Sequence, residues 1–293
     1  MNFLMPVIKL MRPTQWIKNG FVFMPLIFSG RLLMLDDVIK VVGMCLAFCL
    51  ASSATYIFND YMDMEQDRAH PRKKNRPLAS GAISPVAALF AMFLLIIGIF
   101  VLAVAMKTPP RGFIFLGIYL ILQVIYSAKL KDVVLVDVLT ISVGFLLRVL
   151  GGAVVIGVTV SSWLVLCTFS VAILLALGKR RHEVVILCEG ASCHRPVLEN
   201  YSVSLLDQLL QVVTTSTFIF YCLYSVRGNP TGGIHAETMM YTIPLVTYGI
   251  FRYMYLIYQL EDGGSPTVML LTDPPLLICA ILWLAACIAV IYL

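Results

Sequence analysis

The stretch 59–67 combines an amide with three aspartates at spacings that suit a divalent cation: Asn59, Asp60, Asp63 and Asp67. On a helix, positions 60, 63 and 67 fall on one face, which Asn59 joins. Carboxylates held so close repel one another unless a cation lies between them. Oxygen ligands without histidine or cysteine favour magnesium, so we expect Asp60, Asp63 and Asp67 to bind Mg2+.

Three arginines, Arg68, Arg72 and Arg76, follow this acidic stretch at helical spacing. Guanidinium groups bind phosphate oxygens in bidentate geometry, and carboxylates hold the metal that accompanies them. The combination favours a site for a metal-bound diphosphate. The alternative is a solvated helix end whose acidic charge the arginines neutralise. Because an apolar segment of membrane-spanning length comes directly before the motif, we favour the diphosphate site.

Two more polar clusters follow apolar segments further along the chain. Each is explained either by contact with substrate phosphate or by the anchoring of a membrane helix with basic residues on its inner side. The second cluster contains one acid among its bases. The clusters consist of Tyr126, Lys129 and Lys131, and of Lys179, Arg180, Arg181 and Glu183.

Three ionisable residues lie within or beside apolar runs, where a charge is costly and faces a cavity or a partner. Arg148 falls inside an apolar segment and either binds substrate or pairs with a carboxylate of the bundle. Lys18 follows Trp16, so substrate binding competes with an interfacial position of its ammonium group. Asp137 lies among valines and leucines.

The composition requires a lipid environment for most of the chain. Of 293 residues, 60% are hydrophobic and 13% are charged, and the mean hydropathy is +0.92. Soluble domains carry about 25% charged residues. The net charge of +5 is modest. Nucleic-acid binding would need a basic patch with interleaved aromatic residues, and the sequence shows none.

Apolar runs long enough to span a bilayer, about 20 residues each, predict an all-α, polytopic membrane bundle. We expect one domain over 1–293 with short cytoplasmic cap loops. Basic residues gather in alternate connections, which predicts a cytoplasmic amino terminus and active site in an inner (cytoplasmic) membrane. About nine helices are expected, near 17–34, 38–58, 85–106, 112–128, 133–157, 162–178, 202–226, 237–259 and 274–293.

The acidic stretch, followed by Asn75-Arg76-Pro77-Leu78, resembles the first Asp-rich signature of the UbiA-type intramembrane prenyltransferases. The resemblance extends over nearly the whole chain. Additional segments are similar to the branch of decaprenyl-phosphate phosphoribosyltransferases, and the first and fourth of them point to that branch. They lie at 12–19, 126–131, 144–148, 178–183, 251–253 and 263–266.

The resemblance implies a nine-helix bundle around a membrane cavity, with Mg2+ on the diphosphate of phosphoribosyl pyrophosphate. A polyprenyl phosphate would accept the 5-phosphoribose, and pyrophosphate would leave. Asn59, Asp60, Asp63 and Asp67 would be catalytic. The substrate-binding residues would be Lys18, Arg68, Arg72, Arg76, Tyr126, Lys129, Lys131, Arg148, Lys179, Arg180, Arg181 and Glu183.

The segment 179–183 departs from the superfamily, whose prenyl-transferring branches carry a second Asp-rich motif there. One acid and several bases favour a site that handles more phosphate. The alternative is prenyl transfer from a prenyl diphosphate to an aromatic or haem-like acceptor. A transporter of anions or lipid phosphates is more remote, because no inverted repeat is evident. The oligomeric state remains open.

Overall fold

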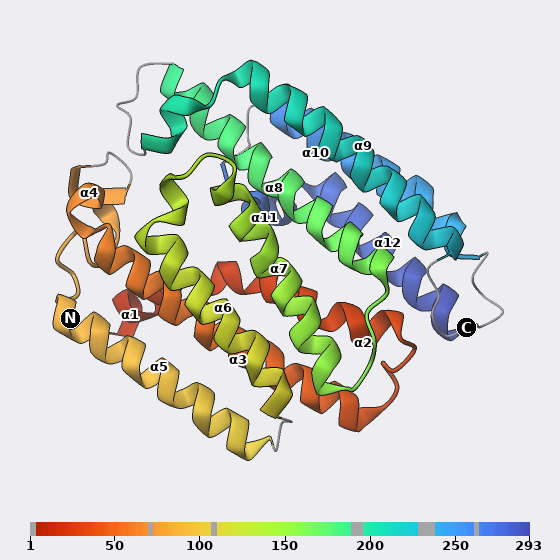
Figure 1. Ribbon diagram of the computed structural model, residues 1–293, viewed down its shortest axis with the longest axis horizontal. Coiled ribbons are helices and arrows are strands. Elements are labelled where there is room, and N and C mark those ends of the chain that lie inside the picture. The colour runs from red at the N-terminus through yellow and green to blue at the C-terminus, as the bar shows by residue number, and fades with distance from the viewer. Residues whose placement is uncertain (1–3, 70–72, 107–109, 189–195, 228–237, 261–263) are drawn as a thin grey trace.

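The apolar segments form helices throughout the described part of the chain (Figure 1). The structure is a computed structural model that describes residues 4–69, 73–106, 110–188, 196–227, 238–260 and 264–293. These residues contain no β-strand, so the predicted all-α class is confirmed. The α-helices are α1 (Leu4–Met11), α2 (Met24–Phe28), α3 (Leu35–Met62), α4 (Met64–Ala69), α5 (Pro85–Ala105), α6 (Pro110–Ala128), α7 (Val136–Val155), α8 (Ser162–Cys188), α9 (Val203–Arg227), α10 (Ile243–Tyr258), α11 (Pro266–Thr272) and α12 (Pro274–Tyr292). The 3-10 helices are η1 (Pro13–Phe23), η2 (Lys73–Asn75), η3 (Leu130–Asp132), η4 (Pro196–Asn200) and η5 (Thr238–Thr242).

Seven of the described helices are long and apolar enough to cross a membrane, namely α3, α5, α6, α7, α8, α9 and α12. Their spans agree with seven of the nine expected segments. The remaining two are not single long α-helices. The segment expected at 17–34 consists of η1 followed by α2, and the one expected at 237–259 consists of η5 followed by α10.

The 3-10 geometry of η1 gives the first segment a membrane-spanning length. A 3-10 helix rises about 2.0 Å per residue and an α-helix about 1.5 Å, so residues 13–28 extend about 30 Å. This equals the thickness of the hydrocarbon core, about 30 Å. Sixteen residues would be too short to span as a continuous α-helix, so the 3-10 form is what gives this predicted segment its length.

Helices α3 and α7 form the interior of the bundle, and α5 and α12 lie at its periphery. Within their most apolar stretches, α3 and α7 each bury 67% of their residues, whereas α5 and α12 each bury 11%. The outer helices expose large apolar side chains such as Phe93, Phe100 and Ile281. Water would not tolerate such a continuous apolar surface, so these faces contact lipid and the chain is a multi-pass membrane protein.

One row of side chains attaches η1 to α3, because residues three apart align in a 3-10 helix. Trp16 Nε1 donates to Ser53 Oγ at 3.0 Å, and Asn19 Nδ2 lies 3.2 Å from Cys49 Sγ. The third member of this row, Val22, is fully buried. The other two rows of η1 therefore do not pack on α3.

A glycine of α7 allows the backbone of η1 to pack directly against that helix. A Cβ atom built on Gly152 would lie 2.1 Å from the carbonyl oxygen of Val22. A backbone oxygen within the 3-10 helix cannot rotate away as a side chain can. Gly152 thus sets the distance between η1 and the centre of the bundle.

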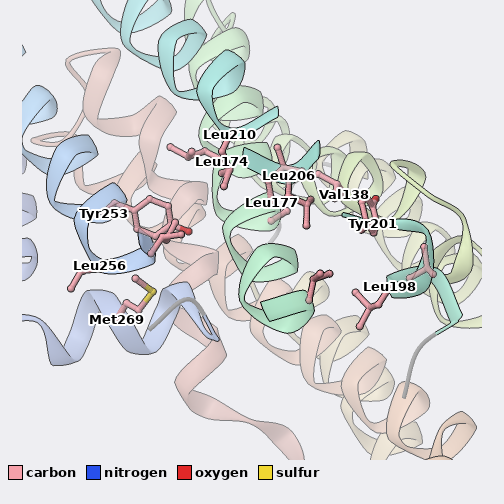
Figure 2. Packing of buried hydrophobic residues seen from close by; sticks show 14 residues of the cluster. Val138, Leu174, Leu177, Leu198, Tyr201, Leu206, Leu210, Tyr253, Leu256 and Met269 are labelled. Atoms are coloured by element: carbon pink, nitrogen blue, oxygen red, sulfur yellow. The ribbon is translucent and has the colours of Figure 1, made fainter. Parts of the chain in front are cut away.

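The polar connections gather at one end of the bundle, at the upper left of Figure 1. At this end, η3, between α6 and α7, contacts η4, which precedes α9. Apolar packing around α8 supports this end (Figure 2), through Leu174 and Leu177 of α8, Leu206 of α9 and Tyr253 of α10. Helix α8 continues to Cys188, so the expected connection at 179–200 begins as helix, and 179–183 lies on it.

We expect Gly152→Ala to lower the thermal unfolding midpoint in detergent. Overpacking typically costs about 1–3 kcal/mol, and here the obstructing atom belongs to the backbone. Gly117→Ala on α6 is the matched control, since nothing lies within 4 Å of a Cβ atom built there and alanine favours helix. Equal midpoints for the two variants would contradict the close approach of η1 and α7.

Candidate active site

The acidic motif lies where α3 ends. Helix α3 stops at Met62, Asp63 caps it, and Asp67 belongs to α4. Helical hydrogen bonds persist across the junction, since the Asp63 amide donates to the Asn59 carbonyl at 2.9 Å and the Asp67 amide to the Asp63 carbonyl at 2.8 Å. The expectation of three carboxylates on one face of a single helix is nevertheless wrong. The chain changes direction at Asp63, and the carboxylates divide into two groups.

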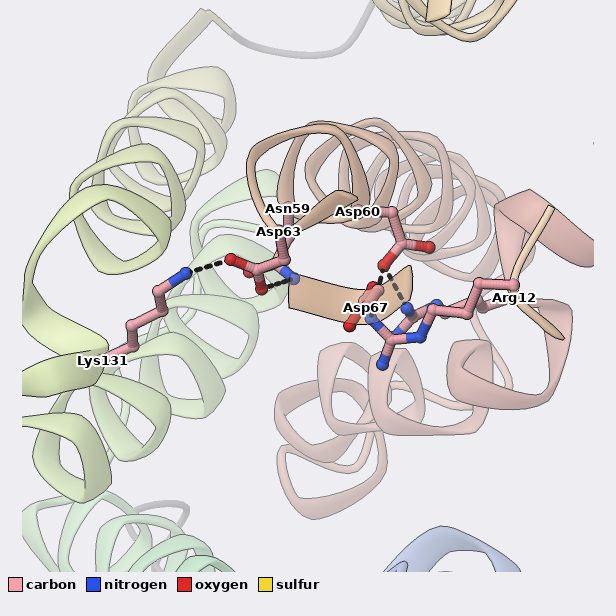
Figure 3. A network of polar contacts seen from close by, with 7 residues as sticks. Arg12, Asn59, Asp60, Asp63, Asp67 and Lys131 are labelled. Carbon is pink, nitrogen blue, oxygen red and sulfur yellow. Dashed lines mark hydrogen bonds and ion pairs between the residues drawn. The ribbon is translucent and has the colours of Figure 1, made fainter. Parts of the chain in front are cut away.

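Asp60 and Asp67 form the first group and converge on one guanidinium (Figure 3). Arg76 Nη1 lies 3.0 Å from Asp60 Oδ1 and 2.6 Å from Asp67 Oδ2. Arg12 Nη2 lies 2.5 Å from the same Asp60 oxygen. Both carboxylates are almost completely buried. Two acids and two arginines thus neutralise one another at the boundary of the membrane.

Asp63 forms the second group and points the other way, toward η3 (Figure 3). Lys131 Nζ makes an ion pair with Asp63 Oδ1. Asn59 Nδ2 donates to the other carboxylate oxygen at 3.0 Å. Lys131, expected to contact substrate phosphate or to anchor its helix, thus contacts the acidic motif directly.

The donor set suits a magnesium ion that shares its coordination with a substrate. Asp60 and Asp67 direct oxygens at a single position, which Arg76 Nη1 occupies. Mg2+ typically takes one or two carboxylates and completes its shell with water and phosphate oxygens. Within the described ranges, no three His, Cys, Asp or Glu side chains are grouped closely enough to hold a metal by themselves. The residues fit a two-carboxylate site, and Asp63 stands apart from it.

A second charged network lies between α7 and α8, with Arg180 at its centre. Arg180 is 1% exposed, and its Nε lies 2.6 Å from Asp137 Oδ2. Its Nη1 pairs with Glu183, and its Nη2 donates to the Tyr126 hydroxyl at 3.4 Å. These four groups join three helices, α6, α7 and α8. Arg180 is thus a buried structural cation, while Glu183 and Tyr126 are its more accessible partners.

Tyr201 completes this network from the segment before α9. Its hydroxyl donates to Asp137 Oδ1 at 2.8 Å and accepts from the Leu135 amide at 2.7 Å. Burial, together with the neighbouring Asp137 carboxylate, raises the pKa of Tyr201 to about 12, although the Leu135 amide acts in the opposite direction. The hydroxyl consequently keeps its proton at neutral pH and remains a donor to Asp137.

The other two bases of the 179–183 segment have separate partners. Arg181 Nε lies 2.7 Å from Asp207 Oδ1, and its guanidinium stacks 4.3 Å from the ring centroid of Tyr258. Lys179 Nζ lies 3.8 Å from Glu183 Oε1. Its side chain is 42% exposed, which makes Lys179 the base of this segment most accessible to a ligand.

Arg148 is buried in α7 and contacts neutral groups. Its Nε donates to Asn19 Oδ1 at 2.7 Å, its Nη1 to the Gly144 carbonyl at 2.7 Å and its Nη2 to the Tyr119 hydroxyl at 3.1 Å. No carboxylate pairs with it in the described part of the chain. The alternative of a carboxylate partner for Arg148 is therefore wrong.

The remaining predicted residues lie apart from these networks. Arg68 pairs with Glu65 at 2.6 Å on the exposed side of α4. Lys129 is exposed at the start of η3, and Arg72 lies outside the described residues. Lys18 is half-buried on η1.

Arg12 is a residue of the acidic site that residue spacing did not identify. Its backbone is left-handed, with φ 53° and ψ 60°, immediately before Pro13 at the start of η1. This sharp turn directs the guanidinium at Asp60 and over the ring of Tyr56, 4.9 Å away. The dipeptide Arg12-Pro13 indicates the turn, but Asp60, the partner of Arg12, lies 48 positions away in the sequence.

The fold and the charged end together define a multi-pass, all-α membrane protein with a polar site at one end of its bundle. A model of the UbiA prenyltransferase family matches residues 24–181. The chain belongs to the UbiA prenyltransferase family and is a transferase.

Two sequence relatives cover nearly the whole chain. The decaprenyl-phosphate phosphoribosyltransferase of Corynebacterium glutamicum is 29% identical over 294 residues, which cover 98% of this chain and 87% of the relative. The protein of the same name from Mycolicibacterium smegmatis is 30% identical over 301 residues, covering 99% and 94%. The predicted resemblance to this branch is confirmed.

Solved structures share the fold. A UbiA homolog from Archaeoglobus fulgidus bound to GPP and Mg2+ superimposes with a TM-score of 0.70 at 19% identity, covering 98% of this chain and all of its own. The same homolog bound to DMAPP and Mg2+ gives a TM-score of 0.71 at 19% identity, with 97% and 98% covered. At this identity the likeness concerns the fold.

We expect Asp137→Asn to destabilise the protein strongly, because it leaves Arg180 buried with one carboxylate partner fewer. Breaking a buried pair typically costs about 3–5 kcal/mol. Asp207→Asn, the matched control, removes the partner of the neighbouring Arg181 at a more exposed position. Thermal unfolding of both purified variants tests this expectation, and a larger effect at Asp207 would contradict it.

Proposed function

We propose that this protein transfers 5-phosphoribose from phosphoribosyl pyrophosphate to a polyprenyl phosphate and releases pyrophosphate, with Mg2+ as cofactor. The observation that carries the proposal is the near-full-length similarity to relatives named decaprenyl-phosphate phosphoribosyltransferase. The charged contacts support it, because Arg12 and Arg76 lie beside the acidic motif and Lys179 adds a partly exposed cation, so cations are available for more than one phosphate group.

Asp60 and Asp67 are the residues that would hold the metal, and Asn59 and Asp63 would flank it. When bound, Mg2+ neutralises charge on the diphosphate leaving group. Arg12 and Arg76 carry guanidinium groups beside the same carboxylates, so they are close enough to donate to phosphate oxygens. Bidentate guanidinium contacts with phosphate are strong and directional.

The transfer needs positioning and charge stabilisation more than proton chemistry. The bond between ribose C1 and the diphosphate oxygen breaks, and an oxygen of the acceptor phosphate forms a bond to C1. The electron pair of the broken bond leaves with pyrophosphate. Because the attacking phosphate is already an anion, no general base is required, and catalysis rests on orientation and preorganised charge.

The acidic site would face the cytoplasm of an inner-membrane protein. Basic residues, including Lys129, Lys131 and Lys179, accumulate at the same end of the bundle as the acidic motif. Such a bias marks the cytoplasmic side of a multi-pass protein. Phosphoribosyl pyrophosphate is a soluble, highly charged donor and would reach the site from that compartment, whereas the acceptor would enter from the bilayer.

Transfer of radiolabelled phosphoribose to the lipid fraction, by purified protein in nanodiscs with Mg2+, tests the proposal. We expect Asp60→Asn and Asp63→Asn to lose about 100-fold or more of the rate, as loss of one preorganised electrostatic contact does. Asp36→Asn is the control, because this exposed aspartate lies at the opposite end of α3. Absence of label from the lipid with the unaltered protein would refute the donor assignment.

Removal of the divalent cation should abolish the same transfer, and added Mg2+ should restore it. Without the cation, charge on the diphosphate leaving group is not neutralised, so transfer should stop. The donor set consists of oxygen atoms and therefore favours Mg2+ over soft metals, which prefer cysteine or histidine. Equilibrium dialysis against a chelator followed by metal titration provides the measurement. Transfer that continues at full rate without metal would contradict the site.

A second candidate is prenyl transfer, because solved structures with this fold carry GPP or DMAPP with Mg2+. A prenyl diphosphate would use the same carboxylates, and an aromatic or haem-like acceptor would replace the lipid phosphate. Consumption of a prenyl diphosphate together with such an acceptor, without transfer of phosphoribose, would favour this alternative.

A further inference from the structure

Lys18 is a half-buried cation for which the described residues supply neither a carboxylate nor a hydrogen-bond acceptor. It lies on η1, in the first membrane-crossing segment. Several other half-buried or buried cations contact a carboxylate, among them Arg12, Arg76, Lys131, Arg180, Arg181 and Arg252.

Arg148 brings a second uncompensated charge to the same region. Its guanidinium binds the side chain of Asn19, the residue that follows Lys18. Phe21, which follows Lys18 by one turn of η1, packs against Phe145, and the Arg148 guanidinium lies 5.4 Å from the centroid of the Phe145 ring. Asn19 itself is completely buried and is held by α3 through Cys49 and Ser52. These contacts fix the Arg148 guanidinium and the backbone of η1 beside Lys18.

Two neighbouring positive charges at membrane depth are costly unless an anion accompanies them. The neutral groups that contact Arg148 orient its guanidinium but do not compensate its positive charge. We propose that Lys18 and Arg148 form an intramembrane anion subsite that receives the phosphate of a lipid acceptor. Lys18 would contact the phosphate directly, and Arg148 would act as a positioning residue through Asn19 and through its charge. This inference rests on the proposed function.

The register of η1 places the subsite below the acidic site. With three residues per turn, Gln15, Lys18 and Phe21 of η1 lie in one row, which is not the row packed on α3. Arg12 lies immediately before η1, and Lys18 follows the first residue of that helix, Pro13, by five positions, about 10 Å along its axis. Arg12 contacts Asp60, so the row descends from the diphosphate end of the site into the membrane. A ribose would fit between the two phosphate positions.

The same row becomes apolar directly after Lys18, which favours a phosphate attached to a lipid. Phe21 packs edge-on against Phe145 with 5.0 Å between ring centroids, and Phe145 also lies against the Arg148 guanidinium. A soluble phosphate would meet the acidic end first and gain nothing from these rings. A phosphate on a polyprenyl chain would place its charge at Lys18 and its tail beside the apolar residues.

Binding of polyprenyl phosphate, measured by native mass spectrometry without any donor, tests the subsite. We expect Lys18→Met to weaken binding about tenfold or more through loss of a charge-assisted contact, and Lys18→Arg to retain most of it. Lys40→Met is the matched control, since Lys40 pairs with Asp37 at the opposite end of α3. Polyprenol and inorganic phosphate serve as probes of the separate halves of the ligand and should bind weakly.

Kinetics of the same variants assign the subsite to acceptor or donor. A raised KM for polyprenyl phosphate in Lys18→Met, with an unchanged KM for phosphoribosyl pyrophosphate, supports the acceptor role. A raised KM for the donor alone overturns it, as does lipid-phosphate binding that is unaffected by Lys18→Met or matched by inorganic phosphate. If binding depends on Lys18 and yet no phosphoribose is transferred by the unaltered protein, the subsite stands and the proposed function fails.

Arg148→Met tests the positioning role, with thermal unfolding as a check that the bundle persists. In a folded variant, weaker binding of polyprenyl phosphate with unchanged binding of polyprenol supports a contribution of charge at Arg148. A structural role alone would weaken binding of both lipids to the same extent, and that result would remove Arg148 from the subsite.

Discussion

Charge at the edge of a bilayer is stable only beside opposite charge, and the polar end of this bundle depends on that constraint. Asp60 and Asp67 would repel each other, and burial makes that repulsion stronger. Arg76 bridges them, and Arg12 adds a second positive charge to Asp60. These contacts connect the start of η1, the end of α3, α4 and the loop after η2. The ion pairs that form the acidic site are therefore the same contacts that hold these elements together at this end of the bundle.

The same constraint organises the junction of α7 and α8. Arg180 is deeply buried because Asp137 and Glu183 compensate its charge and Tyr126 accepts a further hydrogen bond. Helix α8 continues as a helix past Gly178, so the basic segment is rigid and its members point in different directions. Arg180 is buried in the core, Arg181 pairs with Asp207, and the side chain of Lys179 remains partly accessible. A run of bases in sequence thus does not act as a single phosphate-binding patch.

The fold by itself does not select the donor. Solved proteins with the same architecture carry short prenyl diphosphates, whereas the sequence relatives bear the name of a phosphoribosyltransferase. Shared architecture with different substrates is common, because chemistry resides in local side chains. In this chain, the local features that bear on the substrate are the bases at 179–183 and two cations without a carboxylate partner among the described residues, Lys18 and Arg148.

The sequence by itself determined the all-α membrane class, the spans of the long helices and the acidic motif, because apolar runs and i, i+3 spacings are local properties. Only the tertiary structure decided which charges meet. It joined Arg12 to Asp60 and Lys131 to Asp63, assigned Arg180 to the core and, among the described residues, gave Arg148 neutral partners in place of a carboxylate. Local spacing also did not anticipate the break at Asp63 or the 3-10 form of η1. Both depend on packing against residues distant in sequence, such as Gly152 beneath Val22, and pairwise contacts of that kind leave no periodic signal in the chain.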